Sequence, residues 1–506
     1  MLAQVHSFIL QGIDPLACEI EVDVADRGLA KTMIVGLPDA AVKQSLERAR
    51  SATGNSGYPC PDARRLVNLA PADVRKEGPL YDLPIAIGLL LAQQVIQTQR
   101  HKSLLFAGEL ALDGRIRPIN GAINMAMLAE AMGMDGIVVP IDSASEAAAV
   151  GRIEVYPADT LASVVSFLNG VHEIEPQPRV DVDDLLSGEH AAIDFADVRG
   201  QEAAKRAMII AAAGAHNLLM LGPPGSGKTM MAKALPGILP PLSREEALEV
   251  TRIYSSVGQI PKGTPLMTRR PVRMPHHTAS SIAIIGGGAI PRPGEVSLSH
   301  HGVLFLDELP EFPRTVLEVM RQPLEDGCVT ISRIHSSLKF PARFMLVAAM
   351  NPTPKGTKPT DEFSQRQMEQ YLSRLSKPLI DRIDLHVEVP AVPHHQLTGK
   401  APEGTGSTAM RQQVSQARAA QAKRNGGPLK TNATLSGREL DKHAALDDVG
   451  REVLKQAMTE LGLSARAYDK VRRVARTIAD MEGLEAVQHH HIAEAVQYRL
   501  LDRQLG

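Results

Sequence analysis

The stretch Gly222-Pro223-Pro224-Gly225-Ser226-Gly227-Lys228-Thr229 decides the fold of the second half of this chain. An apolar run, Leu218 to Leu221, precedes it, and a helix-prone stretch, Met230 to Leu235, follows it. In a glycine-rich loop between a strand and a helix, backbone N–H groups and the positive end of the helix dipole point at phosphate oxygens. Lys228 would reach the β- and γ-phosphates, and the Thr229 hydroxyl would hold Mg²⁺. A chance glycine loop would not explain the flanking strand and helix, so the motif predicts a site for ATP or GTP.

The composition is that of a folded protein with several domains. With 506 residues, 44% hydrophobic and 22% charged, the chain should hold about three cores. No apolar run reaches membrane-spanning length, and residues 1–10 carry no basic region or cleavage signal, so we expect a cytoplasmic protein without a membrane partner. Cys18, Cys60 and Cys328 are too scattered to predict a disulfide framework or paired metal ligands.

The charge balance restricts how a nucleic acid could bind. The net charge is −2, aromatic residues make up 3% of the chain, and there is no Trp. The chain therefore has few aromatic side chains that could stack on bases. A DNA partner would have to be bound through its phosphates by a local basic patch.

Residues 1–171 are predicted to form a mixed α/β domain, with short strands such as Thr32 to Val35. Motifs at residues 77–84, 108–121 and 136–140 together resemble the proteolytic domain of Lon-type proteases. The resemblance implies a Lon-protease-like (ribosomal S5 domain 2-like) fold.

The catalytic pair of that protease family is missing. In Lon-type proteases a Ser follows the Gly-Pro pair as the nucleophile, and a Lys a few residues past the Pro-Ile-Gly-Gly run is its base. Leu80 and Ile123 stand at these positions here. Neither side chain can attack a carbonyl group or accept a proton, so we expect no peptidase activity.

Two further motifs follow the glycine-rich loop. The apolar run Gly302 to Leu306 ends in Asp307, which would hold Mg²⁺, and Glu308, which would orient and polarise the attacking water. The apolar run Phe344 to Met350 ends in Asn351, which would help to hold that water in line with the γ-phosphate. Polar residues at strand tips are common, but this order after a phosphate-binding loop predicts a nucleotide hydrolase.

The segment Asp194 to Gln201 resembles the one that opens AAA+ modules and runs beside the adenine in that superfamily. An arginine at the place of Arg382 usually projects into a neighbouring subunit's ATP site as an arginine finger, where it stabilises charge on the transferred phosphoryl group. The alternative for Arg382 is a local salt bridge with Asp381 or Asp384. A finger would place each site between two subunits, which predicts a ring, most simply a homo-hexamer.

Two basic segments distinguish the chain from a plain AAA+ core. Residues 259–294 contain five Lys or Arg residues and no acid, and a predicted hairpin at 328–344 contains three cations and no acid. These segments resemble the helix-2 insert and the pre-sensor-1 hairpin of the magnesium-chelatase and MCM-helicase branch of AAA+. The resemblance implies that they face the pore of a ring, with solvated basic loops as the alternative. The candidate DNA contacts are Arg273, Arg333 and Lys339.

More specific motifs narrow the family. They are Ile34 to Asp39, Arg273 to Thr278, Gly286 to Gly288 and Pro291 to Leu298. With the same domain order over essentially the whole chain, they resemble the ComM/YifB group of magnesium-chelatase-like proteins. The resemblance implies a hexameric DNA helicase that uses ATP and Mg²⁺. It would promote branch migration as incoming strands are integrated in natural transformation, with single-stranded and branched DNA as partners.

Three features bear on metal binding. Many members of this group carry a cysteine-rich stretch after the sensor Asn, but residues 351–356 contain no Cys, so we expect no structural zinc. His276 and His277 lack cysteine partners and are interpreted as structural or pore-lining. His489 to His491 are consecutive on a predicted helix and should therefore point in different directions, which makes a poor metal site.

The C-terminal part is predicted to be a helical lid. Ser464 is expected to cap a helix, Ala465 to Met481, on which Arg466, Lys470 and Arg473 share one face at i, i+4 and i+7. One of these cations should reach the γ-phosphate. Arg466 fits the family position best, and Arg473 is the second choice.

The predicted architecture is α/β and has five parts. They are a Lon-like domain at 1–171, an acidic linker at 172–193, an AAA+ ATPase domain at 194–392, a linker at 393–409 and the lid, of magnesium-chelatase C-terminal type, at 410–506. Two alternatives to a DNA helicase stay open: the ATPase subunit of a metal chelatase and a protein-remodelling AAA+ chaperone. An ATP-dependent protease is excluded by Leu80 and Ile123.

Overall fold

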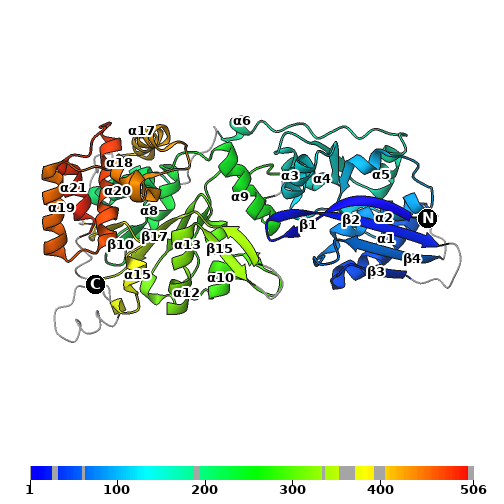
Figure 1. Ribbon diagram of the computed structural model, residues 1–506, viewed down its shortest axis with the longest axis horizontal. Helices are drawn as coiled ribbons and strands as arrows, with labels where there is room; N and C mark the ends of the chain where they lie inside the picture. The colour runs from blue at the N-terminus through cyan, green and yellow to red at the C-terminus, as the bar shows by residue number, and fades with distance from the viewer. Residues whose placement is uncertain are drawn as a thin grey trace. The chain divides into compact units, whose positions relative to one another are not determined.

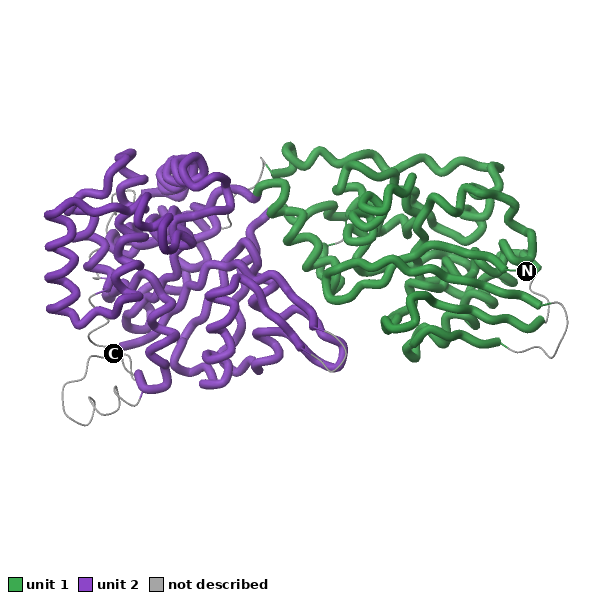
Figure 2. The backbone as a smooth tube through the Cα atoms, viewed as in Figure 1, with its two compact units in different colours: residues 1–187, 243–268 green, residues 188–242, 269–506 purple. Residues whose placement is uncertain are grey.

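The computed structural model describes residues 2–25, 32–59, 63–186, 193–261, 263–332, 337–352, 371–392 and 405–499 (Figure 1). The chain forms two compact units (Figure 2). Unit 1 comprises residues 1–187 and 243–268, and unit 2 comprises residues 188–242 and 269–506. The chain therefore passes between the units after residues 187, 242 and 268.

Unit 1 is built on a mixed sheet. Its strands, among the described residues, are β1 (Leu2–Gln11), β2 (Asp14–Ala25), β3 (Thr32–Val35), β4 (Arg64–Ala70), β5 (Leu104–Phe106), β8 (Gly136–Pro140) and β9 (Glu154–Ala158). They lie in the order β3-β4-β2-β1-β5-β8-β9. β2 pairs antiparallel with both β1 and β4, whereas the other neighbours pair parallel. A hairpin of β6 (Glu109–Leu110) and β7 (Ile116–Arg117) lies outside this sheet.

The helices of unit 1 differ in how much of their surface is buried. They are α1 (Ala40–Asn55), α2 (Asp82–Ala92), α3 (Ala122–Met132), α4 (Ile141–Ala148), α5 (Leu161–Leu168) and α6 (Val182–Leu186), with 3₁₀ turns η1 (Pro79–Tyr81) and η2 (Arg100–Ser103). Asp39 caps α1, because its Oδ1 accepts a hydrogen bond from Val42 N at 2.7 Å. Every residue of α2 is buried, which explains its nearly uninterrupted apolar sequence.

The helix α9 (Arg244–Ser256) also belongs to unit 1, although it follows the glycine-rich loop in the sequence. A capping box of Ser243 and Glu246 starts it. Its apolar side is buried, and it contacts α3. At its end, the Ser255 hydroxyl accepts a hydrogen bond from Gly121 N at 2.9 Å and donates one to the Glu146 carboxylate. α9 is thus fixed to unit 1 by apolar packing and by buried polar contacts.

Unit 2 contains a parallel sheet. Its strands, in the part of the chain that is described, are β10 (Leu218–Leu221), β11 (Val272–Arg273), β14 (Val303–Leu306), β17 (Met345–Met350) and β18 (Leu385–Glu388). Their order is β11-β14-β17-β10-β18, so the strand before the glycine-rich loop, β10, lies inside the sheet between β17 and β18. Two hairpins lie outside this sheet: β12 (Gly286–Gly287) with β13 (Arg292–Pro293), and β15 (Cys328–Ser332) with β16 (Ser337–Pro341).

Both faces of this sheet are covered. Met220 and Phe305 belong to one apolar cluster, whereas an adjacent residue in each strand, Leu219 and Leu306, belongs to another. This two-sided burial explains why these strands are continuous apolar runs in the sequence. The helices of this part are α7 (Glu202–Gly214), α8 (Lys228–Ala234), α10 (Ser281–Ile285), α11 (Glu295–Leu298), α12 (Arg314–Val319), α13 (Arg321–Asp326) and α15 (Lys377–Ile380), with η3 (Phe195–Asp197), η4 (Leu235–Gly237) and η5 (Leu309–Glu311).

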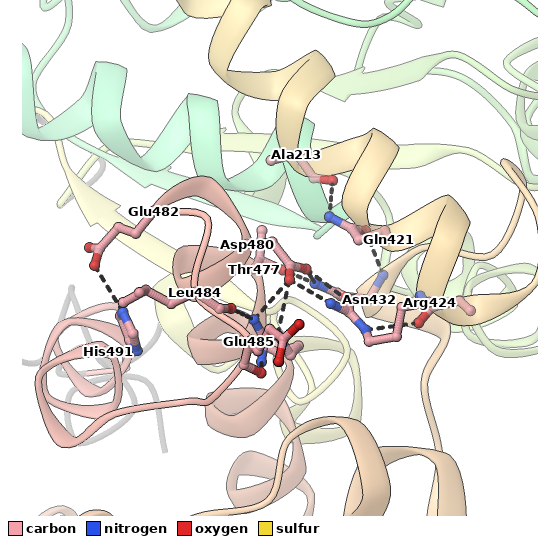
Figure 3. Close-up of polar contacts among 12 residues, drawn as sticks. Ala213, Gln421, Arg424, Asn432, Thr477, Asp480, Glu482, Leu484, Glu485 and His491 are labelled. Carbon is pink, nitrogen blue, oxygen red and sulfur yellow. Dashed lines mark hydrogen bonds and ion pairs between the residues drawn. The ribbon is translucent and has the colours of Figure 1, made fainter.

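Among the C-terminal helices of unit 2, α17, η6 and α20 share a buried polar network (Figure 3). The helices of this part are α17 (Ser407–Asn425), η6 (Asn432–Thr434), α18 (Gly437–His443), α19 (Asp448–Leu461), α20 (Ala465–Met481) and α21 (His489–Gln497). The Asp480 carboxylate pairs with Arg424 at 2.5 Å and accepts hydrogen bonds from Asn432 Nδ2 at 2.8 Å and Arg476 Nε at 3.1 Å. Gln421 Nε2 donates to Ala213 O at 2.9 Å, which fastens these helices to α7.

The predicted mixed α/β fold with a parallel sheet is confirmed. β10 and α20 have the predicted bounds, and Ser464 caps α20 by accepting from Ala467 N at 3.2 Å. The Lon-like character of the N-terminal domain stays a prediction. The continuous ATPase domain predicted at 194–392 differs from the observed division, because residues 243–268 belong to unit 1. Within the described residues, none of the helices has the length and apolar character that crossing a membrane requires.

Candidate nucleotide-binding site

The glycine-rich loop leaves β10 in a conformation that favours glycine. Gly222 N donates to Met350 O at 3.1 Å, and a Cβ at Gly222 would lie 2.0 Å from Val389 O. Gly225 and Gly227 have φ values of +76° and +94°. Positive φ favours glycine, so these positions explain the glycine spacing of the motif.

Lys228 lies folded into the loop. Its ammonium donates to Gly222 O at 2.7 Å, Pro223 O at 2.8 Å and Asn351 Oδ1 at 3.3 Å. Burial lowers the pKa of Lys228 below its usual value, while the Asp307 carboxylate acts in the opposite direction. The structure thus places a partly desolvated cation inside the loop, beside the predicted sensor Asn.

The two predicted Mg²⁺ ligands are in direct contact. Thr229 Oγ1 donates to Asp307 Oδ2 at 2.8 Å, although the residues are 78 positions apart. They meet because β10 and β14 both pair with β17 in parallel, which brings the carboxyl ends of these strands to one edge. Glu308, the next residue, has φ +53°, and its N–H donates to Asp307 Oδ1 at 3.0 Å. This left-handed conformation is unusual for a residue with a side chain.

Asn351 is held at the same edge by a residue that sequence reasoning missed. The backbone N–H of Asn351 donates to the hydroxyl of Tyr371, a side chain that is almost fully buried. Burial raises the pKa of Tyr371 to about 12, so the hydroxyl stays protonated at neutral pH. Tyr371 is thus a support for the predicted sensor.

The opening segment of the module lies along the loop. Gln201 Nε2 donates to Ser226 O at 3.2 Å and to Pro390 O at 2.6 Å. Phe195 is buried, and its N–H donates to Ser407 Oγ at 2.8 Å. The contact of Gln201 with the glycine-rich loop supports the predicted proximity of residues 194–201 to the nucleotide.

Arg382 forms a salt bridge with Glu325, a partner that the sequence analysis did not propose. Its Nη2 lies 2.5 Å from Glu325 Oε1, and its Nη1 donates to Pro378 O at 2.7 Å. The bond from Arg382, together with the charges of Arg382 and Arg466, holds the pKa of Glu325 below its usual value. The two arginines therefore lie within electrostatic reach of the same carboxylate.

The three cations of α20 have different environments. Arg466 is exposed, whereas Lys470 is buried and lies 2.9 Å from Asp384 Oδ1. Arg473 is partly buried. Lys470 is therefore committed to a structural ion pair, and the choice between Arg466 and Arg473 as the lid sensor stays a prediction.

Asp384 is the centre of a buried charged cluster. It accepts a hydrogen bond from Asn217 N at 3.0 Å, and His216 Nδ1 lies 3.6 Å away. Burial alone would raise the pKa of Asp384, but the charge of Lys470 and the contact with His216 hold it well below its usual range. The cluster joins β10, β18 and the lid helix α20.

The candidate DNA contacts differ in how exposed their side chains are. Arg273 forms a bidentate pair with Glu295, at 2.6 and 2.8 Å, and is half-buried. Lys339, in β16, is exposed. Arg333 lies outside the described residues. Arg292 in β13 is a further exposed cation of the first basic segment.

The histidines of α21 correct one expectation. His490 and His491 do not point apart: both reach the Glu482 carboxylate, at 3.2 and 3.0 Å (Figure 3 shows His491). His491 Nδ1 accepts a hydrogen bond from Gln488 N at 2.9 Å, so a neutral His491 carries its proton on Nε2. That nitrogen donates to Glu482 and is not a metal ligand in this tautomer. The loop of the zinc prediction lies outside the described residues beyond Pro352.

The side chains present fit a nucleotide with Mg²⁺. Thr229 and Asp307 offer two adjacent oxygen ligands, which is the chemistry that Mg²⁺ prefers. Lys228 is bound to carbonyl oxygens inside a glycine loop, and a phosphate could replace these oxygens as its partner.

Comparisons with known proteins cover the whole chain. The family model "Magnesium chelatase, subunit ChlI" matches residues 194–417, "Subunit ChlI of Mg-chelatase" matches residues 20–143, and "Magnesium chelatase, subunit ChlI C-terminal" matches residues 404–499. The chain is 43% identical to YifB of Salmonella typhimurium over 506 residues, covering 100% of this chain and 98% of the relative. It is also 43% identical to the competence protein ComM of Haemophilus influenzae over 508 residues, with the same coverage. The magnesium-chelatase 38 kDa subunit of Rhodobacter capsulatus is 25% identical over 213 residues, 38% of this chain and 55% of the relative. The chain is therefore a member of the ComM/YifB family of magnesium-chelatase-like AAA+ ATPases.

Proposed function

We propose that this protein is an ATP-driven DNA helicase that works as a homo-hexamer in the cytoplasm and promotes branch migration during natural transformation. The main structural support is the contact between Thr229 and Asp307 beside Lys228, Glu308 and Asn351 at one edge of the sheet. The full-length relative named competence protein ComM supports the DNA-related role.

Each residue of the site has a distinct task in ATP hydrolysis. Bound ATP would supply the phosphoanhydride bond, and Mg²⁺ would neutralise phosphate charge. Lys228 binds the β- and γ-phosphate oxygens, and Thr229 and Asp307 hold Mg²⁺. Glu308 orients and polarises the attacking water, and Asn351 keeps that water in line.

The position of Arg382 supports catalysis between subunits. Its carbonyl oxygen accepts from Asn217 Nδ2 at 3.0 Å, and Asn217 precedes β10, whereas the glycine-rich loop follows the other end of that strand. Four strand residues span about 13 Å at about 3.3 Å each, so Arg382 is anchored far from the loop of its own chain. In the proposed ring, Arg382 leaves Glu325 and acts on the nucleotide of a neighbour, whereas Arg466, or alternatively Arg473, reaches back to the γ-phosphate as the lid sensor.

DNA would be bound by exposed cations. Lys339 and Arg292 are exposed in the two hairpins of unit 2, and Arg333 stays a candidate from sequence. Arg273 is a weaker candidate, since DNA phosphates would have to displace Glu295 from it. The alternatives, a chelatase subunit or a protein-remodelling chaperone, share the ATPase site but do not need these exposed cations.

The deciding experiment is strand displacement on a forked DNA substrate, with and without ATP. We expect displacement that requires ATP, and an ATPase rate that rises with single-stranded or branched DNA and falls steeply with salt. An ATPase rate that DNA does not change, in a protein that hydrolyses ATP, would favour protein remodelling. A protein that stays monomeric with nucleotide and DNA present would contradict the ring.

A further inference from the structure

The peptide group that joins β17 to Asn351 is bound on both of its sides. On one side, the Met350 carbonyl accepts a hydrogen bond from Gly222 N at 3.1 Å, next to the pair that Met350 forms with Leu221 of β10. The N–H and C=O of a trans peptide group point in opposite directions. The N–H of Asn351 is therefore directed toward the other side of β17, where β14 lies.

The ladder between β14 and β17 ends before it reaches this N–H. Its last pair is Leu306 with Ala348, and the chain after β14 turns away into η5. A buried peptide N–H without an acceptor is costly. The hydroxyl of Tyr371 accepts from Asn351 N and thus takes the place of a ladder partner.

The ring of Tyr371 fixes the position of this hydroxyl. Tyr371 is 4% exposed and belongs to the same apolar cluster as Leu309 in η5 and Phe312 just after it. Side chains in a closely packed core have little freedom to change rotamer. The packing of this cluster therefore determines where the acceptor for Asn351 N lies.

Arg374 ties the same segment to the turn after β14. Its Nη1 lies 2.8 Å from Glu311 Oε2 and donates to Pro310 O at 3.3 Å. Two residues further on, Ser376 Oγ accepts from Arg321 Nη2 at 2.8 Å, which ties the segment to α13. Residues 371–376, which we call the brace, thus contact both the end of β17 and η5.

These two places have to keep a fixed spacing during ATP hydrolysis. Glu308 comes after β14 and Asn351 comes after β17, and the proposed reaction needs both side chains at one water molecule. A displacement of about 1 Å can lower a rate about 10²-fold. Because the brace contacts both ends, it can set this spacing.

A tyrosine that only fills the core is the alternative explanation. Phenylalanine would fill the same space without the cost of burying a hydroxyl. Here the hydroxyl is bound to the peptide of the predicted sensor, and an ion pair joins its segment to the turn beside the predicted acid. Both contacts favour a role in positioning.

We propose that Tyr371 is a positioning residue for ATP hydrolysis. Its hydroxyl, held in place by the brace, fixes the Asn351 peptide so that the Asn351 side chain meets the attacking water. Arg374 supports it by fastening the brace to η5. This inference rests on the proposed role of Asn351 in the ATPase reaction, and it adds two residues that lie outside the nucleotide-binding motifs.

The test is steady-state ATP hydrolysis without DNA, in the wild-type and Asn351→Ala backgrounds. Tyr371→Phe keeps the ring and removes the acceptor. In the wild-type background it should lower kcat about 10- to 100-fold. The Kd of a fluorescent ATP analogue should change less than about two-fold, because the glycine-rich loop keeps its own contacts. In the Asn351→Ala background Tyr371→Phe should have almost no effect on kcat, because no side-chain amide is left to position.

Tyr498→Phe is the matched control. It also removes a hydrogen-bonded hydroxyl from a partly buried tyrosine of unit 2, but that hydroxyl donates to Glu494 Oε1 at 3.2 Å, among the C-terminal helices. This variant should keep the wild-type kcat. Arg374→Gln removes the ion pair with Glu311 and should lower kcat a few-fold, with no further loss when it is combined with Tyr371→Phe.

An unchanged kcat in Tyr371→Phe, or an equal fall in kcat in both backgrounds, overturns the proposal. If Tyr371→Phe does not fold, as judged by thermal unfolding, Arg374→Gln in the two backgrounds decides in the same way. Failure of the proposed function gives a different result. A wild-type protein that hydrolyses ATP but ignores DNA contradicts the helicase and leaves this test intact, whereas a wild-type protein without hydrolysis contradicts both.

Discussion

Single side chains of the nucleotide site are held by partners that are distant in the sequence. Thr229 contacts Asp307, and Lys228 contacts Asn351 across 123 positions. Motif order suggested these four residues, because Asp307 and Asn351 directly follow strands of one parallel sheet, and Lys228 and Thr229 open the helix after the loop that leaves a third strand. It did not predict the contact of Tyr371 with Asn351 or that of Glu325 with Arg382, since nothing in the spacing of a lone Tyr or Glu marks its partner.

Two substitutions separate ATP binding from hydrolysis. Lys228→Ala should abolish detectable ATP binding, because it removes the cation inside the glycine loop. Glu308→Gln should keep binding but lower kcat by about 10²- to 10⁴-fold, because the amide cannot accept a proton from water. Binding of a fluorescent ATP analogue and phosphate release measure the two steps. A Glu308→Gln protein that loses binding as well would contradict the assigned role.

Arg382→Ala should stop turnover without loss of nucleotide affinity. A cation that acts across a subunit boundary is worth about 10³- to 10⁵-fold in kcat, whereas the binding loop belongs to the other chain. Glu325→Gln is the control, since it removes the salt bridge but leaves Arg382 in place. A large fall in ATP affinity in Arg382→Ala would instead show that Arg382 is a structural residue of its own subunit.

At the level of elements, the lid helix α20 is fastened to the sheet by a buried ion pair. Lys470 was predicted as one of three cations on a helix face, one of which should reach the γ-phosphate, and it lies 2.9 Å from Asp384. The periodicity of α20 predicted the helix and its bounds. It could not predict that a carboxylate just before β18, Asp384, would form a buried ion pair with one cation of that face.

Asp384→Asn should destabilise unit 2 at neutral pH, because it leaves the buried Lys470 without its counter-charge. Breaking such a pair costs about 3–5 kcal/mol. The pKa of Asp384 in the folded protein lies below its value in the unfolded chain, about 4. The stabilisation by Asp384 is therefore complete above pH 4 and is lost as the pH falls further.

The difference between wild type and Asp384→Asn should accordingly shrink from pH 7 to pH 3. Denaturant unfolding, followed by a probe attached to the lid, measures it. Asp381→Asn is the matched control, because Asp381 is the neighbouring acid and is not part of the buried cluster. Equal stability of wild type and Asp384→Asn at pH 7 would contradict the role of the pair.

At the scale of the whole molecule, sequence reasoning found a chain of consecutive domains, and the structure shows an interleaved one. Residues 243–268 form α9 and its flanks in unit 1, between two segments of unit 2. The structure shows that α9 is a helix that starts with a capping box. The sequence does not reveal which unit buries its apolar side. That choice depends on Gly121 and Glu146, which are more than 100 positions away.

Removal of residues 1–187 should yield an aggregating protein, because the apolar side of α9 then has no cover. A second truncation that also replaces residues 243–268 by a short glycine–serine linker should stay soluble and bind ATP. The bridge is feasible, since Arg270 donates to Pro240 O at 2.7 Å and the two ends of unit 2 therefore meet. Equal solubility of both truncations, in size-exclusion chromatography, would contradict the assignment of α9.

The path of the chain through α9 restricts how such a protein can change during evolution. A gene for two consecutive domains can lose or exchange either one by a single recombination at the linker. Here, exchange of the N-terminal residues alone would leave α9 packed against a surface of another sequence. A second, in-frame exchange of residues 243–268 would be needed to restore the fit. Because the segments of the two units alternate along the chain, we expect both units to be inherited together.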